Sequence, residues 1–196
     1  MEFSDEEEEE DGGEENGFEE DEDVRLDVNL SLAELEKKIL HGFWLHDDKD
    51  RPNLTVALDG TGDYRSIVEA VGHIPNNSDT FFYIYIKAGI YNENVYVGGE
   101  KRNIVMSGDG IGKTIIQSSR SNSSGFGIGV SAALNIESQL FLAKDMSILN
   151  SAGHEGGQAV ALRTTGNHIA SLRCSIEGVS GHLVHTPREE PVFLQL

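Results

Sequence analysis

From Leu54 onward, the chain is a series of short β-prone runs separated by glycine, asparagine and serine. Two of these runs, Phe141–Ile148 and His168–Ser175, echo each other about 27 residues apart, a period within the range of solenoid repeats. A strand-and-turn unit that recurs in this way is typical of a solenoid, in which each coil buries its apolar side against the next. A β-sandwich also has many short strands, but usually at a spacing of about 8–12 residues and with cleaner alternation. The pattern therefore favours an all-β fold, a right-handed single-stranded parallel β-helix, over a sandwich.

The runs that carry this pattern all lie beyond residue 100. In order, they are NIVMSG, TIIQSS, SAALNIES, LFLAKDMSILN, QAVALRTTG, HIASLRCSIEG and HLVH. We expect each to contribute one strand to a partial β-helix of a few coils.

Two segments that precede these runs have patterns of their own. The run at residues 54–60 predicts a short strand followed by an Asp-Gly turn. Residues 64–74 predict a short helix that is stopped by Pro75. Its apolar residues at helical spacing are Ile67, Val68, Val71 and Ile74.

The run TFFYIYIKAGIY, residues 80–91, is rich in aromatic and β-branched residues. It is too continuous for a half-exposed strand and predicts a strand that is buried on both faces. Phe82, Tyr83 and Tyr85 could stack on a sugar, but their place in this run favours packing in the core.

The segment at residues 1–23 differs from the rest of the chain in charge. It holds fifteen acidic side chains and no Lys or Arg, whereas the rest of the chain carries 19 acidic and 15 basic side chains, a net charge of −4. Like charges repel, and only Met1, Phe3 and Phe18 are sizeable apolar groups, so nothing offsets the entropy of ordering this segment. We expect residues 1–23 to be a disordered acidic tail.

Residues 24–51 are expected to form one amphipathic helix and a linker. Ser31 is a candidate N-cap, with Glu34 at the capping-box position. The apolar stripe of this helix consists of Leu32, Leu35, Ile39 and Trp44. The charged stretch HDDKDRPN then ends the helix, so the predicted β-helix domain occupies residues 52–196.

Several classes of protein are disfavoured. No stretch approaches the roughly 18 consecutive apolar residues of a membrane helix, and the N-terminus lacks the basic start and apolar region of a secretory signal. The single Cys174 cannot form an intrachain disulfide. We expect neither a membrane nor a nucleic acid as a partner.

The stretch SGDGIGKTII, residues 107–116, is similar to a phosphate-binding loop. A P-loop needs a glycine, four residues and then Gly-Lys-Ser/Thr, but Ser107 stands where the first glycine should be. Lys113 stands where a dinucleotide motif would have its third glycine. The stretch therefore predicts a turn between two strands.

Six runs together identify a family: LTVALDGTGDYRSIVEAV, YIYIKAGIYNENV, NIVMSGDGIGKTII, AKDMSILNSAG, QAVALR and RCSIEG. They resemble the plant pectinesterases, or pectin methylesterases, in order and spacing. The resemblance extends over Pro52–Leu183, about two-thirds of the chain. It implies a right-handed parallel β-helix, makes GDGIGKT a turn of that helix, and places the acidic tail and one helix where the family has an inhibitor-like pro-region.

The family hydrolyses galacturonate methyl esters in pectin. One aspartate attacks the ester carbonyl and is held by an arginine, while a second, protonated aspartate donates a proton to the departing methanol. Glutamine side chains stabilise the charge that develops on the carbonyl oxygen. The resemblance implies pectin as partner, the cell wall as location, and no cofactor or metal.

Few of these catalytic groups have a counterpart in this chain. The oxyanion glutamine of QAVALR falls on Gln158, whereas a second glutamine and the acid aspartate fall on Ser180 and Gly181. A substrate-contacting threonine falls on Ala133. The nucleophilic aspartate and its arginine fall beyond Leu196. The resemblance therefore predicts a truncated and catalytically impaired or inactive pectinesterase.

Alternatives remain at this point. The chain could be a non-catalytic pectin-binding, carbohydrate-binding or interaction module, or an incomplete product that further coils would complete. Another set of hydrolase-type residues, Ser180, His182, His185 and Glu189, is expected to be polar surface near the chain end. His154 and Glu155 are expected in a solvated loop, and Lys144 and Asp145 as coil-stabilising residues. We also expect an apolar tail, PVFLQL, and self-association through an uncapped last coil.

Overall fold

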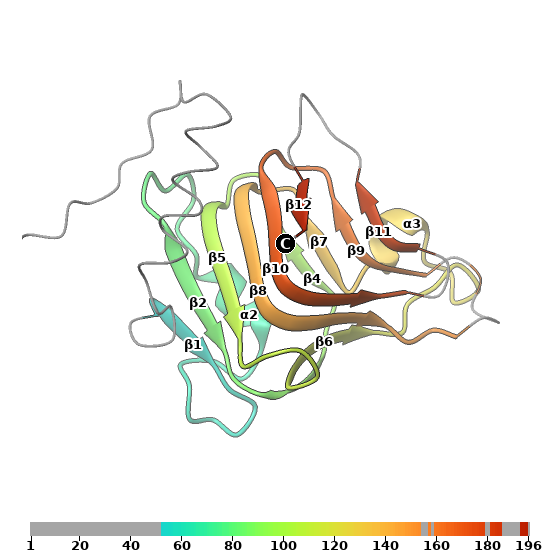
Figure 1. The fold of residues 1–196 in the computed structure, drawn as a ribbon, viewed down its shortest axis with the longest axis horizontal. Helices are drawn as coiled ribbons and strands as arrows, with labels where there is room; N and C mark the ends of the chain where they lie inside the picture. The colour runs from blue at the N-terminus through green and yellow to red at the C-terminus, as the bar shows by residue number, and fades with distance from the viewer. Residues whose placement is uncertain (1–51, 154–156, 158, 179–180, 186–192, 196) are drawn as a thin grey trace, which may run out of the picture.

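A computed structural model describes residues 52–153, 157, 159–178, 181–185 and 193–195, with backbone alone for residues 128, 181–185 and 193–195. The strands wind into successive coils whose corresponding strands pair in parallel (Figure 1). This is the parallel β-helix that the sequence predicts. The expected tail, helix and linker at residues 1–51 lie outside the described residues.

Each full coil crosses three faces. The first face contains β1 (Leu54–Val56), β2 (Phe82–Ile86), β5 (Arg102–Gly108), the first parts of β8 (Gln139–Asn150) and β10 (Ile169–Glu177), and β12 (Phe193–Gln195). The second face contains β3 (Gly89–Asn92), β6 (Thr114–Ser118) and the second parts of β8 and β10. The third face contains β4 (Val95–Val97), β7 (Leu134–Ile136), β9 (Val160–Thr164) and β11 (Gly181–His185).

The two long strands bend where they pass from the first face to the second. Asp145 in β8 and Arg173 in β10 have φ values of 55° and 49°, the left-handed region that non-glycine residues seldom adopt. The Arg173 guanidinium donates two hydrogen bonds to the Asp145 carboxylate, from Nε to Oδ1 at 2.5 Å and from Nη2 to Oδ2 at 2.6 Å. This ion pair joins two coils at the bend, as the sequence predicts for Asp145.

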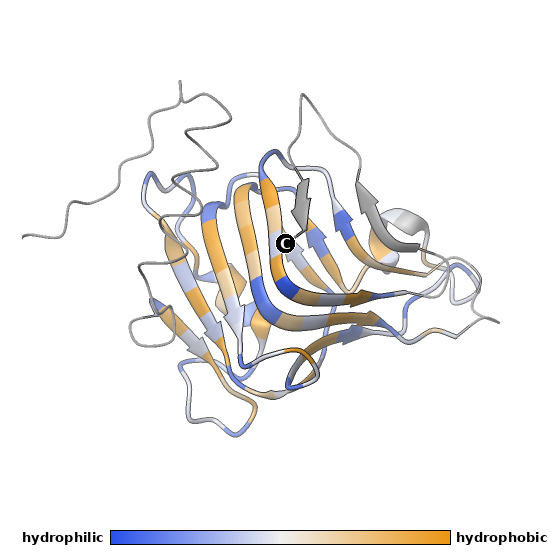
Figure 2. Ribbon diagram, in the orientation of Figure 1, coloured by the Kyte–Doolittle hydropathy of each residue, from blue (hydrophilic) through white to orange (hydrophobic). Residues whose placement is uncertain are grey.

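The core lies inside the coil and is built from in-register apolar ladders. Ile84, Met106 and Ala143 occupy one ladder on the first face and are almost fully buried. Figure 2 shows apolar residues recurring at matching positions of β5, β8 and β10. The next residue in the ladder is Ser171, which is also buried and whose hydroxyl has no hydrogen-bond partner among the described residues.

Helix α2 (Ile67–Gly72) follows β1 and buries Ile67, Ala70 and Val71. It begins at the N-cap Ser66, whose Oγ accepts a hydrogen bond from Glu69 N at 3.3 Å. Glu93 follows β3 in the next coil, and its carboxylate accepts hydrogen bonds from the backbone N–H groups of Ile67 and Val68. Because the first N–H groups of a helix lack partners inside it, this contact fixes the start of α2 against the second coil.

The structure corrects the reading of residues 80–91. These residues form two strands, β2 and β3, instead of one, and β2 is not buried on both faces. Ile84 and Ile86 are buried inside, whereas Tyr83 and Tyr85 are half-buried on the outside. The chain turns at this point because it passes from the first face to the second. Phe82 packs against the main core, as expected.

Two further expectations also change. The repeat between β8 and β10 is 28 residues, the separation of Asp145 and Arg173, and is thus one residue longer than the similarity of the two runs suggests. Phe141 pairs with Ile169, which keeps both side chains inside the coil. The run PVFLQL contributes β12, in which Phe193 pairs with Ile169, instead of a free tail. This parallel pairing supplies hydrogen bonds to the outer edge of β10. Self-association stays a prediction.

Candidate functional site on the third face

The motif positions taken from the sequence converge on the third face of the coil. Gly181 opens β11 and pairs with Val160 in β9, two residues after Gln158 in the chain. Leu134 of β7 pairs with Leu162 of β9, so Ala133 occupies the position beside Ala161. The fold therefore brings together segments that lie far apart in the sequence.

Ala133 and Ala161 are both fully buried and belong to the main apolar core cluster. The position to which the resemblance assigns a substrate-contacting threonine is thus filled by a small side chain that is closed to solvent. A buried alanine contributes to stability, but its methyl side chain cannot form a hydrogen bond with a ligand.

Several of the predicted site residues cannot be placed. Gln158 and Ser180 lie outside the described residues, as do His154, Glu155 and Glu189. His182 and His185 belong to β11, but only their backbone is described. Their roles stay predictions.

Beside these positions, the third face carries polar side chains that the sequence analysis did not single out. Tyr96, Asn135 and Arg163 stand at the same position on β4, β7 and β9. The Tyr96 hydroxyl donates a hydrogen bond to Glu137 Oε2 at 3.0 Å. Arg163 Nη1 donates to Asn135 Oδ1 at 3.0 Å and lies 3.5 Å from Glu137 Oε1.

We call Tyr96, Asn135, Glu137 and Arg163 the third-face cluster. Tyr96 is 54% exposed, and the side chains of Glu137 and Arg163 are each 22% exposed. Tyr96 and Glu137 are 41 positions apart in the sequence, and Asn135 and Arg163 are 28 positions apart. The 28-residue separation of Asn135 and Arg163 equals one coil and is a signal that could have been sought, whereas only the register of the strands identifies Tyr96 and Glu137 as neighbours.

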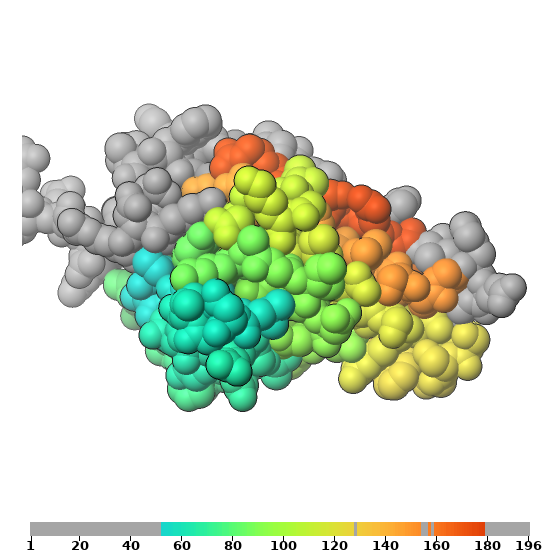
Figure 3. Space-filling model, turned by 90° about the horizontal axis from the view of Figure 1, so that it is seen from below, coloured from blue at the N-terminus to red at the C-terminus, as the bar shows by residue number. Residues whose placement is uncertain are grey.

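A long connection borders this face. Between β6 and β7 the chain forms a projection that includes α3 (Ile128–Ser131), visible as the yellow lobe beside the orange segment in Figure 3. The side-chain amide of Asn150 donates hydrogen bonds to the carbonyl oxygens of Arg120, Ser131 and Val160, at 2.9–3.0 Å. Asn150 thereby ties the connection to the start of β9.

The GDGIGKT stretch is a turn between β5 and β6, as predicted. Its backbone N–H groups donate inside the protein: Asp109 to Thr114 Oγ1, Gly110 to the carbonyl of Asp145, and Gly112 to Ser147 Oγ. The Asp109 carboxylate in turn accepts the Tyr85 hydroxyl at 2.6 Å. Since a phosphate cradle needs free N–H groups, this turn is not one.

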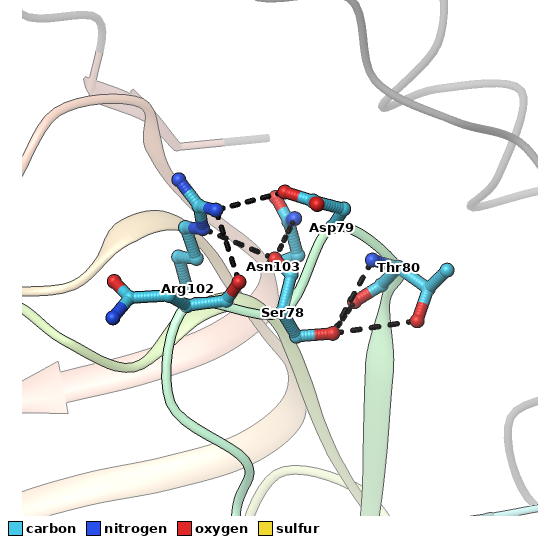
Figure 4. Close-up of polar contacts among 6 residues, drawn as sticks. Ser78, Asp79, Thr80, Arg102 and Asn103 are labelled. Carbon is cyan, nitrogen blue, oxygen red and sulfur yellow. Dashed lines mark hydrogen bonds and ion pairs between the residues drawn. The ribbon is translucent and has the colours of Figure 1, made fainter.

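A second polar group, at the start of β5, is structural. Arg102 donates hydrogen bonds to the carbonyl oxygens of Asn77 and Ser78 and to the Asp79 carboxylate, and the Asn103 side chain also donates to Ser78 O (Figure 4). These contacts fasten the loop before β2 to the start of β5. Among the described residues, no three His, Cys, Asp or Glu side chains lie close enough to hold a metal ion. The same residues contain no helix that is long and apolar enough to cross a membrane.

The three-faced coil and the register of β7, β9 and β11 define a parallel β-helix protein with its candidate site on the third face. The Pectinesterase family model matches residues 53–189. The chain therefore belongs to the pectinesterase family, as its motifs predict.

Individual relatives and solved structures agree with this assignment. The chain is 43% identical to Pectinesterase 2 of Citrus sinensis over 140 residues, which cover 71% of this chain and 27% of the relative. Pectinesterase 1 of Arabidopsis thaliana is 39% identical over 140 residues, covering 71% and 24%. The chain thus spans about a quarter of the length of the curated relatives that it matches.

The structure of pectin methylesterase from carrot superposes with a TM-score of 0.62 at 44% identity and covers 63% of this chain and 39% of that one. The rice weevil pectin methyl esterase gives a TM-score of 0.60 at 20% identity, covering 80% and 54%, which shows the fold alone. The fold is the right-handed parallel β-helix that the sequence predicts.

Proposed function

We propose that this chain binds pectin in the plant cell wall through its third face and hydrolyses the methyl esters of pectin very slowly or not at all. Gly181 is the observation that carries the second part of the proposal. It pairs with Val160 at the start of the candidate site, where the family resemblance puts the proton-donating aspartate. A glycine has no group that can protonate a leaving methanol.

The expected loss of rate is large. General-acid catalysis is typically worth about 10²–10⁴ in rate. Removal of one oxyanion donor, the role that the resemblance gives to the position of Ser180, typically costs about 10²–10³. Gln158 retains the family residue, but a single donor does not supply an acid. A polysaccharide can be held by contacts other than a proton donor and an oxyanion donor, so we expect binding to persist without turnover.

Methanol release and pectin binding test the two halves of the proposal separately. The full chain is incubated with highly methyl-esterified pectin, and methanol is compared with that from a heat-killed sample. In parallel, the protein is sedimented with an insoluble pectin gel, with cellulose powder as the control. We expect binding to the pectin gel without methanol release.

Two results would contradict the proposal. Methanol release by the unmodified chain that is lost in Gln158→Ala would show a working esterase. Equal retention by pectin and cellulose would show that the chain does not recognise pectin.

A further inference from the structure

We propose that the outer surface of the first face is a docking site for the amphipathic helix that the sequence predicts within residues 30–45 of the same chain. We call residues 30–45 the N-terminal segment. This inference does not rest on the proposed function, which concerns the third face, and either can hold without the other.

The docking surface is a row of apolar side chains on neighbouring strands. Its members share one register position on β2, β5, β8 and β10 (Figure 1), and they are Tyr83, Val105, Leu142 and Ala170. Each precedes a residue of the inner ladder, and because the side chains of a strand alternate between its two faces, the row points outward. Val105, Leu142 and Ala170 form an apolar cluster separate from the core inside the coil. We call these four residues the first-face row.

The row is more buried than an open sheet surface. Val105 and Leu142 are each 5% exposed, and Ala170 is 8% exposed. In the coils that contain Val105 and Leu142, the outward side chains of the other two faces are only half-buried. They are Ile115, Ser147, Asn135 and Arg163. A parallel sheet with buried apolar residues on both surfaces is typically covered on both.

The partly buried apolar side chains that pack against this cluster, among the described residues, lie at one end of the row. They are Phe81 and Tyr83. Ala170 is three strands away from Tyr83, about 14 Å at the usual spacing of strands, so an aromatic ring at β2 cannot cover it. The rest of the row therefore needs another cover.

The N-terminal segment is attached to the chain beside this row. Asn53 N donates to Tyr83 O at 2.9 Å, and Asn53 Oδ1 accepts from Tyr83 N at 2.7 Å. The chain is thus fixed next to the first residue of the row, eight residues after the segment ends. Eight extended residues span up to about 26–29 Å, which is longer than the row. The segment can therefore reach the whole row.

The pattern of the segment also fits the row. Leu32, Leu35 and Ile39 recur at helical spacing, and Phe43, four residues after Ile39, lies closer to their face of the helix than Trp44 does. From Leu32 to Phe43 this stripe extends about 16 Å, against about 14 Å for the row. Because a short helix is marginal in water until its apolar stripe is packed, docking would stabilise the segment and cover the first face together.

Thiol labelling tests whether the segment covers the row. Leu142→Cys places a reporter in the middle of the row, in a Cys174→Ser background that removes the native thiol. Ala170→Cys places a second reporter at the far end of the row. Ile115→Cys is the control reporter, since Ile115 lies on the second face, outside the proposed contact.

Two substitutions in the segment are compared with each reporter. Ile39→Asp puts a negative charge in the middle of the apolar stripe. His41→Asp is its matched control, because it makes the same charge change at pH 8, where histidine is neutral, on the opposite side of the helix.

The full chain is labelled with iodoacetamide at pH 8, mass spectrometry measures the rate, and circular dichroism checks the folding. We expect both row reporters to react slowly in the chain with an unmodified segment. Ile39→Asp should accelerate them at least about ten-fold, because a buried unpaired charge is costly and the helix undocks. His41→Asp should leave their rates unchanged. Ile115→Cys should react at one rate in all three proteins.

Four results would overturn the inference. Row reporters that react as fast as Ile115→Cys before any change in the segment would show that the row is open. Slow labelling that neither substitution changes would show that another part of the chain covers the row. Equal acceleration by Ile39→Asp and His41→Asp would assign the effect to charge instead of the stripe. Labelling that accelerates on dilution would assign the cover to a second copy of the chain. None of these results depends on pectin, so the proposed function is judged separately.

Discussion

Substitution of Gly166 by alanine should be among the most damaging single changes in this domain. Gly166 lies between β9 and β10, directly against the coil below. A Cβ atom at this position would lie 1.7 Å from the carbonyl oxygen of Ser138 and 2.8 Å from its carbonyl carbon. Because the clashing atoms belong to the backbone, they cannot move away by a change of rotamer, as the end of a flexible side chain can.

The cost follows from how the two segments are held. Ile136 pairs with Thr164 just before the contact, and the N–H of Thr165 donates to Ile136 O at 2.9 Å. Relief of the clash would require the two coils to separate by about 1 Å or more, which breaks this ladder and opens the close-packed interior. Overpacking typically costs about 1–3 kcal/mol, and a backbone obstacle places this case at about 3 kcal/mol or more.

Urea unfolding measures the change in the free energy of unfolding, and thermal unfolding measures the change in melting temperature, both followed by circular dichroism. A loss of about 3 kcal/mol would lower the melting temperature of a domain of this size by roughly 6–12 °C. Gly99→Ala is the matched control, since Gly99 faces the carbonyl of Glu137 in the same stack of turns but at 3.5 Å, an ordinary contact. A Gly166→Ala variant as stable as Gly99→Ala would refute the reasoning.

Two titratable groups give the remaining predictions. Burial raises the pKa of Tyr91 to about 12, so as the pH rises this tyrosine loses its proton first in the unfolded chain, and the free energy of unfolding should fall by up to about 1.4 kcal/mol per pH unit between roughly pH 10 and 12. Urea unfolding at a series of pH values should show a weaker fall for Tyr91→Phe, and identical pH slopes for the two proteins would contradict the assignment. Burial likewise raises the pKa of the Cys174 thiol to about 11. Because the thiolate is the reactive form, at pH 8 the folded protein should react with iodoacetamide about 100-fold more slowly than the urea-unfolded chain. Mass spectrometry measures both rates, and equal rates would show that the thiol is not protected.

Much of the fold could be predicted because local patterns and coil geometry agree. The spacing of Ile67, Val71 and Ile74 identified α2, and the β-prone runs identified the strands. The left-handed bends were not predictable, since Arg173 is not a residue type that signals such a conformation, and Asp145, although aspartate is enriched in it, adopts other conformations far more often. The repeat length was in error by one residue because sequence similarity aligned His168 with Phe141, whereas burial aligns Ile169 with it.

The candidate site was predictable only where a motif covers it. The QAVALR run led to β9, and the register then placed Gly181 beside Val160. The third-face cluster has no motif, because Tyr96, Glu137 and Arg163 become neighbours only through the pairing of three strands. The burial of Ala133 was also missed, since its closure to solvent depends on packing between elements distant in the sequence.

The constant offset between β8 and β10 also bears on how the protein emerges from the ribosome. Each strand of a coil docks on the strand one coil earlier, so no coil needs a partner that has not yet been synthesised. At about 5–20 residues per second, β10 becomes available to β8 about one to six seconds later. Until then, the edge of β8 is the growing end of the fold and is open to pairing with another chain. Slow translation of residues 151–177 would prolong that exposure, and a nascent-chain chaperone would be most useful during that interval.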